Sequence, residues 1–168
     1  MNEAHKSTAS KFNRVIVVAV PMAAILFQVY VPRFLTYLAY LELPLLVTVY
    51  FALTRRSPVA GVLYGASVGL AQDSLSHHPL GMYGIVKTLV GYFAAFVSQR
   101  FEVRNPSVRA ILAFFFYFFH EFFYWVLARA LLGEPVEFDP ARTIVLAVLN
   151  AAVAPPLFLI LDKVKATE

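Results

Sequence analysis

Six apolar runs joined by short polar segments make up most of this sequence, and they constrain its fold more than any other feature. A helix crosses the hydrocarbon core of a bilayer with about 20 residues, and each run is that long or nearly so. Of all residues, 60% are hydrophobic and 14% are charged, whereas about a quarter are charged in a soluble domain. We therefore predict an all-α, polytopic membrane protein, a six-transmembrane-helix bundle. The predicted spans are Val15–Val31, Phe34–Leu53, Ser57–Leu75, Leu80–Ser98, Val108–Leu132 and Thr143–Leu161.

The segments between the spans are too short to hold a soluble domain. Prolines support the divisions, because Pro58, Pro106 and Pro140 stand where helices tolerate proline, at or just before the first turn. The sequence therefore predicts one transmembrane domain. It covers residues 15–161, between an N-terminal segment of residues 1–14 and a C-terminal tail of residues 162–168.

Prolines also occur inside three of the predicted spans, as Pro21, Pro44 and the pair Pro155-Pro156. A proline inside a helix lacks the N–H that its turn requires, so it kinks or opens the helix and leaves a carbonyl without its usual donor. At membrane depth, neighbouring groups must then satisfy that carbonyl. We expect these three places to shape the interior of the bundle.

Basic residues stand at every second boundary between spans, and this bias predicts the direction of each helix. Short cytoplasmic segments carry an excess of Lys and Arg, so both termini are expected in the cytoplasm. No small-x-small cleavage pattern follows Val31, so we expect the first span to be retained rather than cleaved as a signal peptide. The net charge of +4 reflects this topology and not a nucleic-acid partner. The basic boundary residues are Lys6, Lys11, Arg14, Arg55, Arg56, Arg100, Arg104, Arg109, Lys163 and Lys165.

A row of small residues runs along the third span. Gly61, Gly65 and Gly69 recur every fourth residue, and Asp73 ends the row. Residues four apart lie on nearly the same side of a helix, so three missing side chains leave a groove where another backbone can press. Close packing of this kind is how helices associate in a bilayer. The row therefore predicts a helix-packing surface, within this bundle or with a partner.

Four polar residues inside the spans fall at similar depths. At 1.5 Å of rise per residue, Glu42, Lys87, Glu121 and Asn150 lie about 10 to 16 Å below the outer ends of their spans. Ionisable groups at that depth cost several kcal/mol unless they have partners. With Asp73 they form a predicted polar layer in the outer half of the bundle. It is either a ligand pocket or relay that opens outward, or a set in which Lys87 neutralises Glu42 or Glu121 and fixes how the helices pack.

The sequence offers no catalytic constellation. It has no cysteine, no phosphate-binding glycine loop and no paired nucleophile and base. The pair His120-Glu121 departs from the zinc motif His-Glu-x-x-His, because Tyr124 stands where the second His is needed. A membrane enzyme needs a polar set near the headgroups, and Asp73 alone does not make one. We expect no enzyme activity, no metal and no cofactor, and we place His77-His78 in a loop at the outer surface.

Several short motifs, in their order and spacing, resemble the MreD family of bacterial rod shape-determining membrane proteins. They are the approach Arg55–Gly61, the stretch G-x-x-x-G-L-A-Q-D from Gly65 to Asp73, the turn Pro79-Leu80-Gly81 and the pair Gly91-Tyr92. The resemblance covers the whole chain. It implies a non-enzymatic component of the cell-elongation machinery in the bacterial inner membrane.

The resemblance also implies partners. Members of this family are thought to associate with MreC, a single-span periplasmic scaffold. Through MreC they would reach the cytoskeletal protein MreB and the glycosyltransferase and transpeptidase that extend peptidoglycan. The family's fold is similar to the S components of energy-coupling-factor vitamin transporters, which have six helices and an outward-facing pocket. A substrate-binding transport subunit is therefore the alternative function, and the polar layer would suit it.

Overall fold

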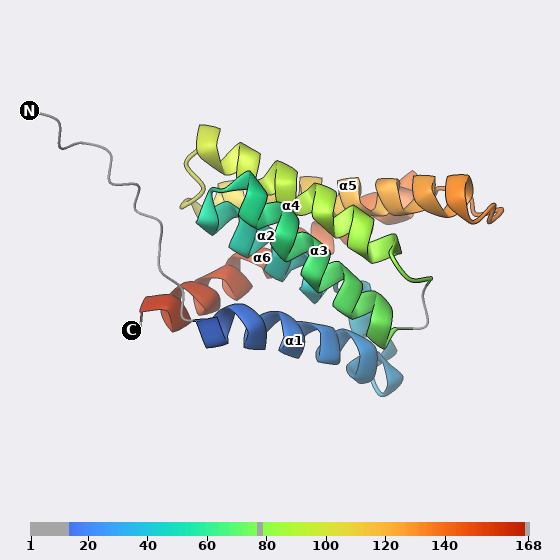
Figure 1. Cartoon of the computed structure of the whole chain (residues 1–168), viewed down its shortest axis with the longest axis horizontal. Helices are drawn as coiled ribbons and strands as arrows, with labels where there is room; N and C mark the ends of the chain where they lie inside the picture. Colours follow the sequence, from blue (N-terminus) through green and yellow to red (C-terminus); the bar gives the residue numbers. More distant parts are fainter. Residues whose placement is uncertain (1–13, 77–78, 167–168) are drawn as a thin grey trace, which may run out of the picture.

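The computed structural model describes residues 14–76 and 79–166, and in these ranges every regular element is a helix. Figure 1 shows the long helices lying roughly along one direction. Most of the predicted N-terminal segment, the loop residues His77-His78 and the last two residues of the predicted tail lie outside the described ranges. The helices are α1 (Arg14–Tyr30), α2 (Leu43–Arg55), α3 (Pro58–Leu75), α4 (Met82–Arg100), α5 (Pro106–Leu131) and α6 (Pro140–Ala166), with two short 3-10 turns, η1 (Val31–Arg33) and η2 (Thr36–Tyr40).

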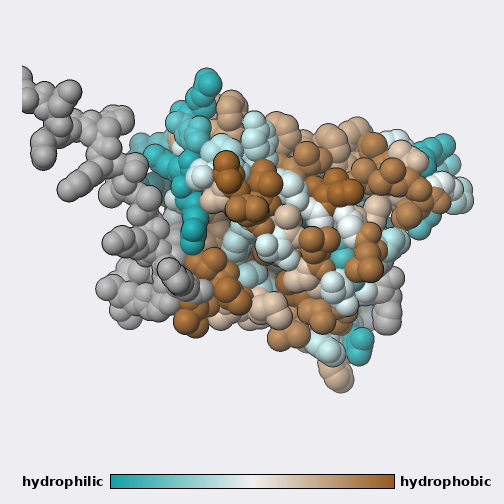
Figure 2. Space-filling model, viewed as in Figure 1, coloured by the Kyte–Doolittle hydropathy of each residue, from teal (hydrophilic) through white to brown (hydrophobic). Residues whose placement is uncertain are grey.

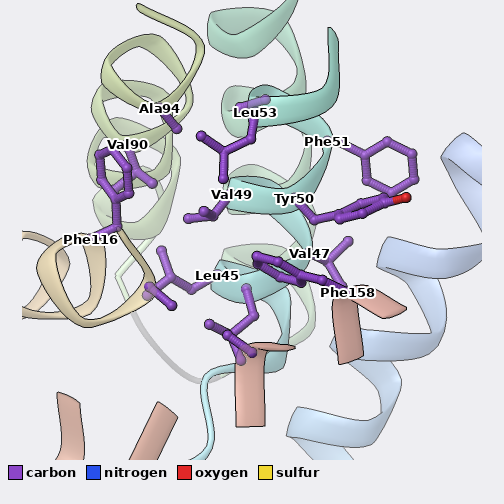
Figure 3. Packing of buried hydrophobic residues seen from close by; sticks show 14 of the residues in the cluster. Leu45, Val47, Val49, Tyr50, Phe51, Leu53, Val90, Ala94, Phe116 and Phe158 are labelled. Carbon is purple, nitrogen blue, oxygen red and sulfur yellow. The ribbon is translucent and has the colours of Figure 1, made fainter. Parts of the chain in front are cut away.

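Helix α2 is the centre of the bundle. It contacts each of the other five α-helices, and every residue from Pro44 to Leu53 is buried. Figure 3 shows its side chains in the core with Val90 and Ala94 of α4, Phe116 of α5 and Phe158 of α6. A helix that is buried on all sides is expected to carry hydrophobic residues on every face, and the buried part of α2 does so.

Four helical stretches are long and apolar enough to cross a membrane. They are Val15–Arg33, Thr36–Arg55, Pro106–Leu131 and Pro140–Val164. Helices α3 and α4 have 18 and 19 residues, but glycines and buried polar residues lower their hydropathy. Figure 2 shows apolar surface across the middle of the molecule and hydrophilic residues gathered toward its two ends. The chain is therefore a membrane protein.

The second predicted span is not one continuous helix. The prediction was Phe34–Leu53, but the 3-10 turn η2 ends at Tyr40 and α2 begins only at Leu43, so the helix is interrupted at Leu41 and Glu42. Pro44 supplies the reason, because it has no N–H to donate to the carbonyl of Tyr40 in the preceding turn. The sixth helix also differs, since it continues to Ala166 through most of the predicted tail.

The other helix ends follow local signals that the sequence carries. Ser57 caps α3, where its Oγ accepts from the backbone N–H of Ala60. Asn105 caps α5 by accepting from Ser107 N–H at 2.9 Å. In both cases a proline follows the capping residue, at the position where a missing N–H costs nothing.

Candidate functional site

The glycine row of α3 lies against the backbone of α4, the next helix of the same chain. A Cβ added at Gly65 would clash with the carbonyl oxygen of Lys87 and lie 2.7 Å from its carbon. At Gly61 and Gly69 it would meet the carbonyls of Gly91 and Tyr83. We call these three contacts the glycine seam. Two helix backbones approach so closely here that no side chain larger than hydrogen fits on α3.

Asp73 closes the seam at its end. Its Oδ2 accepts from the backbone N–H groups of Gly81, at 2.9 Å, and Gly84, at 3.0 Å, and its Oδ1 accepts from Tyr83 N–H at 3.1 Å. The first turn of a helix has N–H groups without intrahelical partners, and a carboxylate there satisfies them and complements the helix dipole. Asp73, which the sequence placed in the predicted polar layer, thus caps α4.

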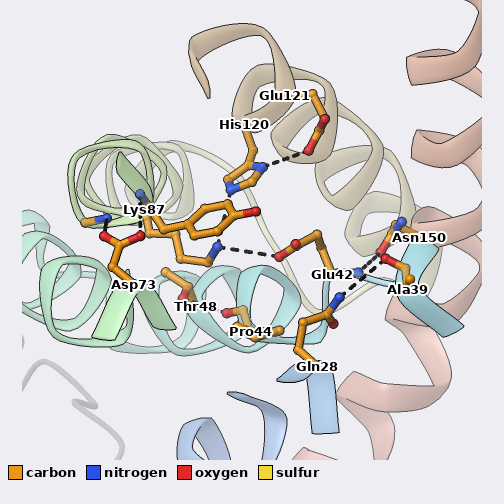
Figure 4. Close-up of polar contacts among 12 residues, drawn as sticks. Gln28, Ala39, Glu42, Pro44, Thr48, Asp73, Lys87, His120, Glu121 and Asn150 are labelled. Atoms are coloured by element: carbon orange, nitrogen blue, oxygen red, sulfur yellow. Dashed lines mark hydrogen bonds and ion pairs between the residues drawn. The ribbon is translucent and has the colours of Figure 1, made fainter. Parts of the chain in front are cut away.

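Lys87 links three helices through a row of polar side chains. Its Nζ lies 3.5 Å from Oε2 of Glu42 and 3.2 Å from Nε2 of His120. Nδ1 of His120 in turn lies 3.3 Å from Oε1 of Glu121. We call these four residues the polar chain, and Figure 4 shows them crossing the interior from the start of α2 to α5. Lys87 and His120 are fully buried, whereas the side chain of Glu121 is 35% exposed.

The two ring nitrogens of His120 face different partners. Its Nε2 faces the side-chain nitrogen of Lys87, and its Nδ1 faces the carboxylate of Glu121. The polar chain therefore has a carboxylate at each end, with Lys87 and His120 between them.

The ring of Tyr83 covers the Lys87 ammonium. Nζ lies 4.3 Å from the centre of that ring, in the range of a cation–π contact. On α5, His120 and Tyr124 stack on the same ring with centroid distances of 5.7 and 5.1 Å. These aromatic groups screen one side of the polar chain from the surroundings.

Asn150 of α6 forms hydrogen bonds with the interrupted backbone before α2. Its Nδ2 donates to the carbonyl of Tyr40 at 2.9 Å, and its Oδ1 accepts from the backbone N–H of Glu42 at 2.9 Å. The carbonyl that Pro44 leaves without a donor is thus satisfied from a distant helix. Because it bonds the backbone of Glu42, Asn150 lies next to the polar chain, with which the sequence analysis grouped it. Its own side-chain hydrogen bonds are with backbone groups.

A cavity of about 380 Å³ opens beside Glu42, between the η1 and η2 turns and the facing ends of α3 and α4. We call it the Gln72 cavity. Three buried polar atoms in the described part of the chain have no hydrogen-bond partner, namely Oε1 of Gln28, Oε1 of Gln72 and Oγ of Ser76. All three residues line this cavity. The remaining lining residues are Val29, Pro32, Arg33, Ala39, Glu42, Leu75 and Tyr83.

Sequence reasoning missed four residues of this region. Gln28, Gln72 and Ser76 are uncharged, so a search for ionisable groups at membrane depth passes over them. Gln72 stands directly before Asp73 in the glycine-row motif, and this position is the one sequence signal that could have marked Gln72 as a candidate. His120 was considered for a metal and set aside, but it joins Lys87 to Glu121.

At the opposite end of the bundle, Arg109 of α5 forms an ion pair with Asp162 of α6. Tyr50 of α2 donates to Oδ1 of Asp162 at 2.9 Å. Within the described ranges, no group of three or more His, Cys, Asp and Glu is arranged to hold a metal ion.

Comparison with known protein families gives a match to the family described as rod shape-determining protein MreD, and the match covers residues 9–164. No curated protein and no solved structure matches the chain significantly.

Proposed function

The chain belongs to the MreD family of rod shape-determining proteins, and from this membership we propose that it is a scaffold or regulator of cell-wall elongation that catalyses nothing. The observation that carries the proposal is the family match over nearly the whole chain. The structure supports it in one respect. The buried charged residues Glu42, Asp73 and Lys87 contact one another or backbone, which suits a protein whose task is to hold a shape.

We propose that the protein resides in the inner membrane with both termini in the cytoplasm. The basic residues at the ends of α2, α4 and α6, between α2 and α3, and near the start of α5 lie at one end of the bundle (Figure 1). The cytoplasmic side attracts such residues. A reporter that is active only outside the cytoplasm tests the orientation. It should be silent after Glu168 and active in the loop at Pro79, and the reverse pattern would contradict the proposal.

A single-span partner of the MreC type needs a surface that the bundle leaves open. The glycine seam is filled by α4, so we propose the face of α5 around Glu121. This carboxylate lies about 15 Å from the end of α5 at Leu131 and is 35% exposed. A partly exposed carboxylate at membrane depth favours a neighbouring helix that offers a hydrogen-bond donor. Phe115 and Phe122 on the same helix are also exposed.

Co-purification with a single-span partner tests this surface. Glu121→Gln should weaken capture of the partner, whereas Glu102→Gln, an exposed change in the loop before α5, should not. Equal capture by both variants would place the partner elsewhere.

Depletion in a rod-shaped host tests the function itself. Depleted cells should become round, and the full-length chain supplied in trans should restore rods. The alternative is a substrate-binding transport subunit, and the Gln72 cavity is the observation that favours it. Under that alternative, depleted cells would keep their shape and lose uptake of a vitamin or another small molecule.

A further inference from the structure

We propose that the Gln72 cavity binds a small zwitterion, whose ammonium group enters among Gln28, Gln72 and Ser76 beside Glu42 and whose anionic group contacts Arg33. The cavity encloses about 380 Å³, which is room for a small ligand or a lipid headgroup. The inference concerns ligand binding and stands independently of the proposed role in cell shape.

The unpartnered atoms of the cavity define what a ligand must offer. Two are amide oxygens, which accept only, and the third is a hydroxyl. Gln72 is 3% exposed, so its Oε1 lies where bulk water does not replace a partner. Buried polar atoms are nearly always hydrogen-bonded, and three exceptions lining one cavity indicate a ligand rich in donors. An ammonium group has three N–H donors and no acceptor.

The charges of the polar chain favour a cation at the same place. The polar chain has a carboxylate at each end, Glu42 and Glu121, and one lysine between them. Of the two carboxylates, Glu42 is 8% exposed and lines the cavity. An ammonium group that enters the cavity would lie beside this buried carboxylate, in a place where water solvates charge poorly and an opposite charge is favourable.

Arg33 supplies the other half of the recognition. It lines the same cavity, is exposed at the end of the turn η1, and holds its guanidinium over the ring of Tyr30, 5.1 Å from the ring centre. A guanidinium matches a phosphate or carboxylate with two parallel donors. A ligand with a cationic end inside and an anionic end at the surface fits this order. Both a phosphoethanolamine headgroup of the bilayer and a free amino acid have that chemistry.

The test uses the purified full-length chain and native mass spectrometry of its bound lipids. Phosphatidylethanolamine and phosphatidylcholine are supplied together, because the second has the same phosphate but no N–H on its nitrogen. We expect retention of the first over the second by about tenfold, the effect of one charge-assisted hydrogen bond. Phosphoethanolamine and L-alanine are titrated in parallel, and binding of either by the same residues would identify a soluble ligand.

Two variants and a matched control assign the binding to this cavity. Ser76→Ala removes a hydroxyl that has no partner among the described residues, so it should weaken binding and leave the unfolding temperature unchanged. Gln72→Leu should weaken binding by about tenfold. Ser67→Ala removes an exposed hydroxyl bonded within α3 and should change nothing.

Three results would overturn the proposal. They are equal retention of phosphatidylcholine, failure of all four probes to bind, or binding that neither Ser76→Ala nor Gln72→Leu weakens. None of them bears on the cell-shape experiment, in which the protein could still be required for rods.

Discussion

The α3–α4 hairpin and the α5–α6 pair are held together in different ways. In the first, glycines bring one backbone against the carbonyls of the other, and Asp73 of α3 caps α4. In the second, the helices have 26 and 27 residues, and aromatic side chains join α5 to the loop that leads into α6. Phe138, in the loop between α5 and α6, packs on Phe122 and Trp125 of α5 with ring centroids 5.8 and 5.5 Å apart.

The difference shows how two less apolar helices can belong to a membrane bundle. Hydropathy selects α5 and α6 as spans and passes over α3 and α4. The less apolar pair, α3 and α4, is the one whose backbones are in close contact. In a bilayer the hydrophobic effect does not drive helices together, and close packing of this kind takes its place. Backbone contacts cannot shift to another rotamer, whereas side chains can. Substitutions should therefore be tolerated worse in the glycine seam than between α5 and α6.

The largest effect is expected from Gly65→Leu. The new side chain would occupy the space of the Lys87 carbonyl, so α3 and α4 must separate and folding should fail. Ala152→Leu, on an exposed position of α6, adds a side chain of the same size and should leave the protein folded. The yield of monodisperse protein in detergent measures both. A folded Gly65→Leu variant would show that the seam is as adaptable as the α5–α6 pair.

Lys87→Met comes next, since Lys87 joins the seam to α5. Removing one partner of a buried ion pair costs about 3–5 kcal/mol, because the other charge is left uncompensated. Adding Glu42→Gln should recover much of the free energy of unfolding, while adding Glu121→Gln should recover less, since His120 stands between. Unfolding titrations of the single and double variants measure the coupling. No recovery with either carboxylate would contradict the pairing.

Much of this comparison could be predicted from the sequence, and the exceptions have physical causes. Apolar runs fix where helices occur, and the spacing of Gly61, Gly65 and Gly69 indicates a surface for close packing. The sequence, however, also placed Asp73 in one polar layer with Glu42 and Lys87, because a sequence does not say toward which neighbour a carboxylate points. Asp73 turns to the N–H groups of α4 instead.

The interruption before α2 shows a second limit. The sequence indicated that Pro44 would free a carbonyl, and that carbonyl belongs to Tyr40. Its donor, Asn150, lies more than a hundred residues further along the chain. Neighbours in sequence reveal such a requirement, but only the packed bundle reveals what meets it.

The smallest effect is expected from Asp162→Asn, at the other end of the α5–α6 pair. The ion pair with Arg109 is partly exposed, with Asp162 at 36%, so water already solvates it and its loss should cost about 1 kcal/mol or less. Tyr50 can still donate to the amide oxygen of the new residue. The free energy of unfolding should then differ little from that of the unmodified chain, and the difference should shrink further at high salt. If Asp162→Asn lowered the free energy of unfolding as much as Lys87→Met, the α5–α6 pair would also depend on a fixed polar contact. The two helix pairs would then not differ in how well they tolerate substitution.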